Sequence, residues 1–168
     1  ECFGSDSNGK SNGHKPKAAS KGRYVQVSAG DSHTCGLTSE GMIECFGSNG
    51  NGRSNKGKPK AASKGRYVQV SAGEFHTCGL TSAGMIECFG SDYSGKTNKG
   101  KPKAASKGRY AQVSAGLQHT CGLTSEGMIE CFGSDNNGRS NGRKPKAASK
   151  GRYVQVSAGD SHTCGLTS

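Results

Sequence analysis

The chain has 168 residues, a length typical of one domain, and a formal charge of +11 from 23 basic and 12 acidic residues. Only 30% of the residues are hydrophobic, none is Trp and 28 are Gly, which has no side chain to bury. This composition excludes one large core and favours small cores that repeat along the chain. We find no apolar run long enough for a membrane span and no signal peptide.

A unit of 43 residues is repeated four times. The units run 1–43, 44–86, 87–129 and 130–168, form a single repeat domain, and each opens with Glu-Cys-Phe-Gly-Ser. Each unit also contains Gly-Arg-Tyr-(Val/Ala)-Gln-Val-Ser-Ala-Gly, followed by His-Thr-Cys-Gly-Leu-Thr-Ser. A period of this length with short strands is typical of propellers and solenoids.

The first predicted strand of the unit is Tyr24–Ala29. Its residues alternate with period two, so we expect Val25 and Val27 to share one face and the polar residues to share the other.

Two more strands, His33–Thr38 and Met42–Phe46, form a predicted hairpin around Ser39-Glu40-Gly41. This sequence fits a three-residue loop ending in a left-handed Gly, with a two-residue loop as the alternative. The polar, Lys-rich stretch 47–66 has room for a weak outer strand near Lys60–Ser63, and no segment shows helical periodicity.

One long motif carries a family resemblance. From Val27 to Gly52 the chain reads Val-Ser-Ala-Gly-x-x-His-Thr-Cys-Gly-Leu-Thr-x-x-Gly-Met-Ile-Glu-Cys-Phe-Gly-Ser-Asn-x-x-Gly. This resembles the repeat of the regulator of chromosome condensation family, which has Gly-x-x-His-Thr, a Gly turn, an aromatic-Gly pair and Asn-x-x-Gly. The resemblance implies an all-β fold, a β-propeller of four-stranded blades. It also brings precedents for protein binding, inhibition and guanine-nucleotide exchange.

The chain departs from that family in two ways. It has four units where seven blades are customary, and Phe replaces the usual Trp at Phe3, Phe46, Phe89 and Phe132. We therefore predict a propeller of four tandem blades in which N-terminal and C-terminal strands pair to close the ring.

The eight cysteines alternate in spacing between 33 and 10 residues. A three-residue hairpin loop places Cys35 opposite Cys45, at the roughly 4.5–5.5 Å Cα separation that suits a disulfide. The predicted bonds are therefore Cys35–Cys45, Cys78–Cys88 and Cys121–Cys131, with Cys2–Cys164 completing the pattern from the half hairpin at each end. Each unit also has a His-Thr-Cys triplet, but the chain lacks the closely spaced Cys pairs of structural zinc sites, so we predict no metal and no cofactor.

The fourth bond leaves the ring size open. Four blades need 90° between neighbours, whereas about 51° separates seven blades and 45° separates eight. We favour a homodimer that completes an eight-bladed ring, with Cys2 of one copy bonded to Cys164 of the other. A four-bladed ring in one chain and a segment of a longer array are the alternatives. The even cysteine count predicts an oxidising compartment, hence a secreted protein.

All basic residues fall in one window per unit, with the core Lys-Pro-Lys-Ala-Ala-Ser-Lys-Gly-Arg-Tyr. Equivalent windows in a propeller form a repeated basic band, which attracts polyanions, although the same charges also serve solubility and protect strand edges. Base-specific nucleic-acid binding is not expected, because stacking aromatics are sparse. The predicted polyanion-binding residues are Lys15, Lys17, Lys21, Arg23, Lys58, Lys60, Lys64, Arg66, Lys101, Lys103, Lys107, Arg109, Lys144, Lys146, Lys150 and Arg152.

Histidines recur at the equivalent positions 33, 76, 119 and 162. A ring of histidines can bind a ligand, but the family resemblance favours a structural hydrogen-bonding role. No Ser-His-Asp arrangement stands out, so we predict no enzyme. The leading hypothesis is a secreted, lectin-like module whose repeated basic sites bind an anionic partner such as an acidic or sulfated glycan. A structural or assembly protein and a protein-binding or inhibitory propeller are the alternatives.

Overall fold

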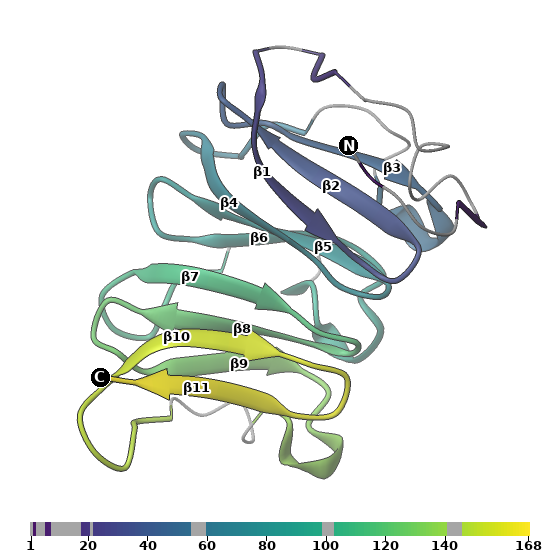
Figure 1. Cartoon of the computed structure of the whole chain (residues 1–168). Coiled ribbons are helices and arrows are strands. Elements are labelled where there is room, and N and C mark those ends of the chain that lie inside the picture. The colour runs from purple at the N-terminus through teal and green to yellow at the C-terminus, as the bar shows by residue number, and fades with distance from the viewer. Residues whose placement is uncertain are drawn as a thin grey trace.

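The computed structural model describes residues 2, 6–7, 18–20, 22–54, 60–98, 103–140 and 146–168. Over these residues the chain is all-β and forms a row of four blades, shown in Figure 1. Three blades have three antiparallel strands and the fourth has two. The strands are β1 (Tyr24–Ala29), β2 (His33–Thr38), β3 (Ile43–Gly47), β4 (Tyr67–Ala72), β5 (His76–Thr81), β6 (Ile86–Gly90), β7 (Tyr110–Ala115), β8 (His119–Thr124), β9 (Ile129–Gly133), β10 (Tyr153–Ala158) and β11 (Thr163–Thr167).

The hairpin between the second and third strands has the predicted three-residue loop. In the first blade Leu37 pairs with Ile43 and Cys35 with Cys45. The loop closes through a 2.9 Å hydrogen bond from the Gly41 N–H to the Thr38 carbonyl, and Gly41 has φ 77°. Only Gly adopts that left-handed conformation without steric cost, which explains its recurrence at this place in the unit.

A β-bulge corrects the predicted alternation of the first strand. The register of β4 shifts between Tyr67 and Gln69, so that Val68 and Val70 do not share a face. Val70 is buried between the first and second blades, whereas Val68 is 47% exposed on the other side of its strand. The bulge recurs in all four blades, and each first strand contributes to one open groove of about 620 Å³.

The predicted outer strand is reduced to one β-bridge in each of the first three blades. Ile43 pairs with Lys60, and the two backbones exchange hydrogen bonds of 2.9 and 2.8 Å. The equivalent bridges are Ile86–Lys103 and Ile129–Lys146. Short 3₁₀ turns precede them at η3 (Gly50–Gly52), η5 (Tyr93–Gly95) and η7 (Asn136–Gly138).

The hydrophobic cores lie between the blades. The first junction buries Leu37 and Ile43 of one blade against Tyr67 and Val70 of the next, beside the Cys35–Cys45 disulfide. The second and third junctions repeat the same set of residue types. The expectation of several small, repeated cores is thus confirmed, and the Gly-rich composition suits it because each core needs few large side chains.

Gln and Ser side chains of the first strands also join neighbouring blades, each to a residue 44 positions further on. The Gln26 side chain accepts a 2.9 Å hydrogen bond from the Val70 N–H, and the Ser28 hydroxyl accepts one of 2.9 Å from the Ala72 N–H. The same two bonds recur at the other two junctions. The first strand of a blade pairs with the second strand along one edge only. These hydrogen bonds satisfy backbone N–H groups on its other edge.

The Cys35–Cys45, Cys78–Cys88 and Cys121–Cys131 disulfides are present, as the register predicted, with Cα atoms 4.0 Å apart in each. The ring is not closed within the chain, however. Cys2 and Cys164 are free thiols, and the first and fourth blades lie at opposite ends of the row in Figure 1. The predicted closure by paired terminal strands is therefore absent here, because the four blades do not turn far enough to bring the ends together. No described helix is long and apolar enough to cross a membrane.

Candidate anion-binding site

The exposed basic residues gather in the turns that lead into the blades. β1, β4, β7 and β10 run in the same general direction in Figure 1, so these turns lie on one side of the molecule. Each turn contains Lys-Gly-Arg directly before the first strand, and its Gly has a φ between 65° and 70°. We define the basic rim as the exposed, described Lys and Arg side chains of these turns: Arg23, Lys64, Arg66, Lys107, Arg109, Lys150 and Arg152.

A buried carboxylate fixes the shape of the turn in each of the first three blades. In the second blade Glu87 is only 5% exposed and accepts hydrogen bonds from the Ser63 N–H at 3.1 Å and from the Ser63 hydroxyl. It also accepts the Tyr67 hydroxyl at 3.0 Å. Burial, the Glu87 charge and this hydrogen bond all raise the Tyr67 pKa, so the phenol stays protonated and continues to donate. Glu44 and Glu130 do the same in their blades, so the rim is held by rigid supports.

The rim arginines of the second, third and fourth blades pack on the hairpin of the preceding blade. A Cβ placed on Gly41 would lie 2.4 Å from the Arg66 Cβ, which shows how closely the Arg66 side chain covers that turn. Arg109 covers Gly84 and Arg152 covers Gly127 in the same way. Each guanidinium thus extends from a fixed stem at a junction between blades, which limits the entropy lost when it binds an anion.

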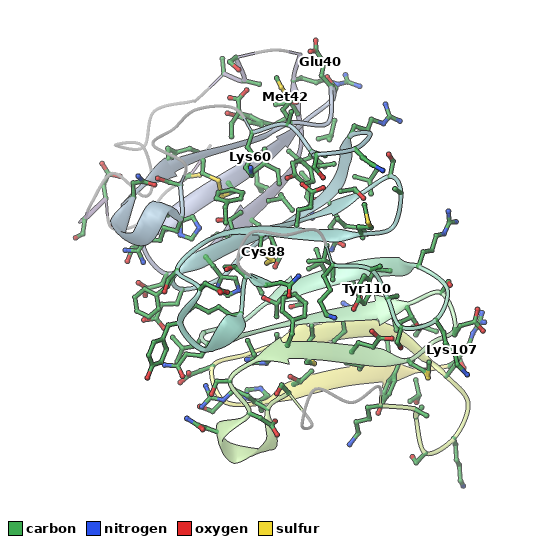
Figure 2. All side chains as sticks on the ribbon, turned by 180° about the vertical axis from the view of Figure 1, so that it is seen from behind. Glu40, Met42, Lys60, Cys88, Lys107 and Tyr110 are labelled. Atoms are coloured by element: carbon green, nitrogen blue, oxygen red, sulfur yellow. A yellow bond between two sulfur atoms is a disulfide. The ribbon has the colours of Figure 1, made fainter. Side chains whose placement is uncertain are left out.

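Three other predicted site residues take a different role. The Lys60 Nζ lies 5.5 Å from the centre of the Phe89 ring, and the Lys103 Nζ lies 5.6 Å from that of Phe132. Lys60 and Lys103 are half-buried and Lys146 is exposed, and all three belong to the outer β-bridges. Figure 2 shows Lys107 at the periphery and Lys60 well inside the outline. Six predicted residues lie outside the described part of the chain: Lys15, Lys17, Lys21, Lys58, Lys101 and Lys144.

The opposite side of the blades carries buried cations and exposed acids. The Arg53 guanidinium donates to the Glu74 carbonyl at 2.7 Å and lies 5.5 Å from the Phe75 ring centre. Lys96 is 1% exposed, lies 5.2 Å from the same ring centre, and burial lowers its pKa. Burial and the nearby Asp31 and Asp160 carboxylates raise the pKa of Glu74. These basic residues are structural, and no described group of three or more His, Cys, Asp or Glu residues is arranged to hold a metal ion.

The recurring histidines connect the blades and do not form a ligand site. The His33 Nε2 lies 2.7 Å from the Thr77 Oγ1, which itself donates to the Arg53 carbonyl at 2.8 Å. Because Thr77 uses its only proton there, it must accept from the His33 Nε2–H. Burial lowers the His33 pKa to about 4, so the imidazole is neutral at pH 7. His76 and His119 repeat the arrangement, and all three rings are fully buried. His162 occupies the equivalent place in the fourth blade and is exposed.

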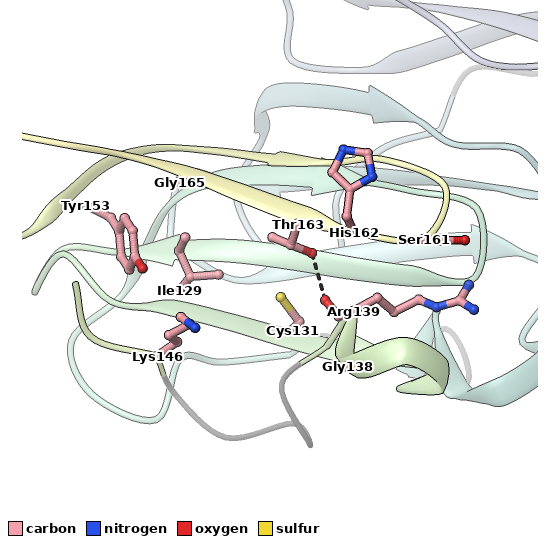
Figure 3. Close-up of a pocket in the computed structure, with 10 residues that line it drawn as sticks. All are labelled: Ile129, Cys131, Gly138, Arg139, Lys146, Tyr153, Ser161, His162, Thr163 and Gly165. Carbon is pink, nitrogen blue, oxygen red and sulfur yellow. Dashed lines mark hydrogen bonds between the residues drawn. The ribbon is translucent and has the colours of Figure 1, made fainter. Parts of the chain in front are cut away.

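A cavity of about 230 Å³ lies beside the fourth blade, between β9 and β11, as Figure 3 shows. There the Thr163 hydroxyl donates to the Arg139 carbonyl at 2.7 Å. Lys146, Tyr153 and His162 also line the cavity. In the first three blades a third strand pairs with the outer side of the middle strand. In the fourth blade no described strand pairs with that side of β11, so the cavity lies at an open edge of the sheet.

The sequence analysis missed the buried glutamates that support the rim. Their signal was nevertheless present, because Glu recurs in every Ile-Glu-Cys tripeptide inside an otherwise apolar strand. An acidic residue at such a position is buried only if it has partners. The Ser and Tyr that recur in the same unit supply them, so the tyrosines serve the core and do not stack on ligands.

Comparisons with known proteins agree with this architecture. The chain is similar to the crystal structure of the CRINKLY WD40 ectodomain from the Arabidopsis thaliana receptor kinase ACR4, with a TM-score of 0.70 and 22% identity over 89% of this chain and 54% of that one. Human WBSCR16 gives a TM-score of 0.69 with 18% identity, covering 87% of this chain and 45% of that chain. Prp20p from Saccharomyces cerevisiae, described with its binding to Gsp1p and histones, gives 0.65 with 19% identity, covering 86% and 42%. The chain thus spans about half the length of these proteins or slightly less.

No curated protein matches the chain in sequence comparison. The pattern of the regulator of chromosome condensation (RCC1) repeat, in contrast, matches residues 24–53, 67–96 and 110–139. These three stretches make up just over half of the chain, and each begins at the first strand of a blade. The chain therefore belongs to the regulator of chromosome condensation repeat family and has its propeller fold.

Proposed function

We propose that the chain is a non-catalytic extracellular binding module whose basic rim binds an anionic polymer such as an acidic or sulfated glycan. The observation that carries the proposal is the rim itself, where equivalent Lys and Arg side chains are exposed at every turn that leads into a blade. Weak equivalent sites in a row act together on a polymer, because binding at one site raises the local ligand concentration at the next.

Two features support an extracellular setting. Three buried disulfides form most readily in an oxidising compartment. Receptor-kinase ectodomains are also among the structures similar to this chain. A binding role without catalysis fits a rim of Lys and Arg side chains, which bind anions through their charge.

Replacing the rim charges should abolish binding to heparin. The variant changes Lys64, Arg66, Lys107, Arg109, Lys150 and Arg152 to Gln, and we expect its affinity at physiological salt to fall on the order of 100-fold. The slope of log affinity against log salt should become shallower as well, because fewer counterions are released on binding. Heparin-column retention and titrations at several salt concentrations measure both effects.

A second variant with the same change in net charge provides the control. It replaces with Gln six lysines that are not among the residues defined as the basic rim, five of them outside the described part of the chain: Lys15, Lys17, Lys58, Lys101, Lys144 and Lys146. We expect a clearly smaller loss of heparin affinity. Equal losses in the two variants would assign binding to net charge alone, and unchanged retention in both would leave solubility or assembly as the role of the basic residues.

We also propose that two copies of the chain complete a ring. Gln155, Ser157 and His162 on the fourth blade are exposed, although their counterparts in the other blades bond to the next blade. Val27 of the first blade is 68% exposed, whereas its counterpart Val70 is 2% exposed. The two outer faces therefore have the residues of an internal junction.

Light scattering and non-reducing electrophoresis of the 17.3 kDa chain test ring completion. We expect a dimer linked through Cys2 and Cys164 that separates into single chains with reductant. A compact monomer that keeps both thiols free at high protein concentration would contradict it.

A further inference from the structure

The repeat symmetry is broken at two places that meet at one junction. At the hairpin tips, Glu40 and Glu126 have Ala83 as their counterpart in the second blade. At the bulge of the first strand, the other blades have Val whereas the third has Ala111. The two alanines are 28 residues apart in the sequence, but both lie at the junction of the second and third blades. A pocket at this junction is lined by Ala111 and by the two neighbours of Ala83, Ser82 and Gly84.

This pocket has a volume of about 350 Å³ and two chemically different sides. Val68, Leu80 and Ala111 form an apolar side, with the buried ring of Tyr110 behind it. The Tyr110 hydroxyl donates to Glu130 at 2.9 Å and so does not add a polar group to the pocket. Ala111 widens this side, because Val in its place would add two methyl groups.

The polar side of the pocket is formed by Arg109 and Ser82. Ser82 Oγ accepts the Arg66 N–H at 3.4 Å, which leaves its own O–H able to donate to a ligand. None of the described residues hydrogen-bonds to or pairs with the Arg109 guanidinium. An unpaired guanidinium beside a hydroxyl donor is the arrangement that binds a carboxylate most effectively.

The substitution at position 83 changes the charge around this arginine. Arg66 packs on the turn that carries Glu40, and Arg152 on the turn that carries Glu126. Arg109 packs on the turn that carries Ala83, so it alone among these three has no carboxylate on the hairpin tip that it covers. The Glu126 Oε1 lies 3.5 Å from the position of a Cβ on the neighbouring Gly108, so Ala83 lowers the number of carboxylates near Arg109 without removing them all.

We propose that this pocket binds a small amphipathic carboxylate. The carboxylate accepts hydrogen bonds from the Arg109 guanidinium and the Ser82 hydroxyl, and a short aliphatic or aromatic group packs on Val68, Leu80 and Ala111. The site shares Arg109 with the basic rim, but its apolar side takes no part in polymer binding. Specificity comes from combining the charged and the apolar side of the pocket. A simple anion has no group to pack on the apolar side, and an alcohol has no negative charge to pair with the guanidinium.

Hexanoate is a suitable probe, with acetate and hexan-1-ol as controls for its two halves. We expect hexanoate to bind with a dissociation constant on the order of 1 mM and to shift backbone amide NMR signals at 80–84 and 109–111. Acetate and hexan-1-ol should each bind at least about 10-fold more weakly. Binding of acetate as tight as that of hexanoate would show an ordinary surface anion site and overturn the proposal.

Three substitutions should each weaken hexanoate binding about 10-fold or more: Ala111→Val by filling the apolar side, Ala83→Glu by adding a carboxylate, and Arg109→Gln by removing the guanidinium. Ala111→Val leaves every charge in place, so heparin retention should not change, which separates this site from polymer binding. If Ala111→Val and the parent protein bind hexanoate equally, the proposal is wrong.

The third junction offers a gain-of-function variant. Changing Glu126→Ala together with Val154→Ala gives it the two features of the second junction, with Arg152 in place of Arg109 and Ser125 in place of Ser82. We expect a second hexanoate site, seen as new NMR shifts at 123–127 and 152–154. Its absence, in a variant whose spectrum is otherwise that of the folded protein, would show that the two alanines do not create the site.

Discussion

Acidification from pH 7 to pH 4 is expected to unfold the blades, and the buried histidines are the main cause. Burial lowers the pKa of His33 and His119 to about 4 and that of His76 to about 3. Nearby cations add to the effect, Arg53 for His33, Lys96 for His76 and Arg139 for His119. In the unfolded chain a histidine titrates near pH 6.5.

Between pH 6.5 and about 4 the unfolded chain therefore binds protons that the folded chain does not. Above pH 6.5 the neutral histidines do not lower the free energy of unfolding. As the pH falls through this window, that free energy decreases by up to about 1.4 kcal/mol per pH unit for each histidine. With three such residues, the loss by pH 4 is a large fraction of the stability of a typical domain. Urea unfolding followed by circular dichroism at pH 7.5, 6, 5 and 4 measures it.

Replacing the three histidines with Gln should flatten this pH dependence. Gln keeps a donor for the threonine of the next blade but cannot be protonated, although the poorer fit lowers stability at pH 7. His162→Gln is the matched control, because His162 is exposed and only adds to the lowering of the His119 pKa, so this variant should keep most of the pH dependence. An equally steep loss of stability in the triple variant would exclude the histidines as the cause.

Gly79→Ala is expected to destabilise the protein by about 3 kcal/mol, the upper end of the usual cost of overpacking a core. A Cβ at Gly79 would lie 2.4 Å from the Tyr67 Cδ1 and 2.7 Å from the Ile43 Cδ1, the latter in the preceding blade. Neither group can move easily, because Tyr67 is held by Glu87 and Ile43 lies in the first core. Thermal unfolding measures the change.

Gly52→Asn is the control for this prediction. Gly52 has φ 75° and no atom within 4 Å of an added Cβ, and Asn tolerates the left-handed conformation better than other non-Gly residues. We expect its stability to stay within about 0.5 kcal/mol of the parent protein. If Gly79→Ala is equally harmless, the junction is looser than its geometry implies.

The repeated strands, the hairpin loop and three disulfides could be predicted because each depends on local periodicity. Once the loop was given three residues, the antiparallel register placed Cys35 opposite Cys45 without further information. The Lys60 bridge was predictable for the same reason, although only as a weak strand.

Features that depend on contacts between blades could not be predicted in this way. The bulge at Val68 shifts the register of the first strand, and alternation alone gives no sign of it. To predict that Lys60 contacts Phe89, or that Ala83 and Ala111 lie at one junction, one must know which face of a blade packs on the next blade. Ring closure depends on the angle between blades, which many small side chains set together.

The Gln, Ser and His side chains that bond to the next blade all do so at a residue 44 positions further on, and this has a consequence for how such a gene can change. Each junction uses the same Gln, Ser, His and Thr positions, so any unit is chemically able to follow any other. Unequal recombination between copies would add or remove a whole 43-residue blade while leaving every remaining junction with its complete set of partners. Blade number can then vary in single steps, and only changes such as those at positions 83 and 111 give one junction an identity of its own.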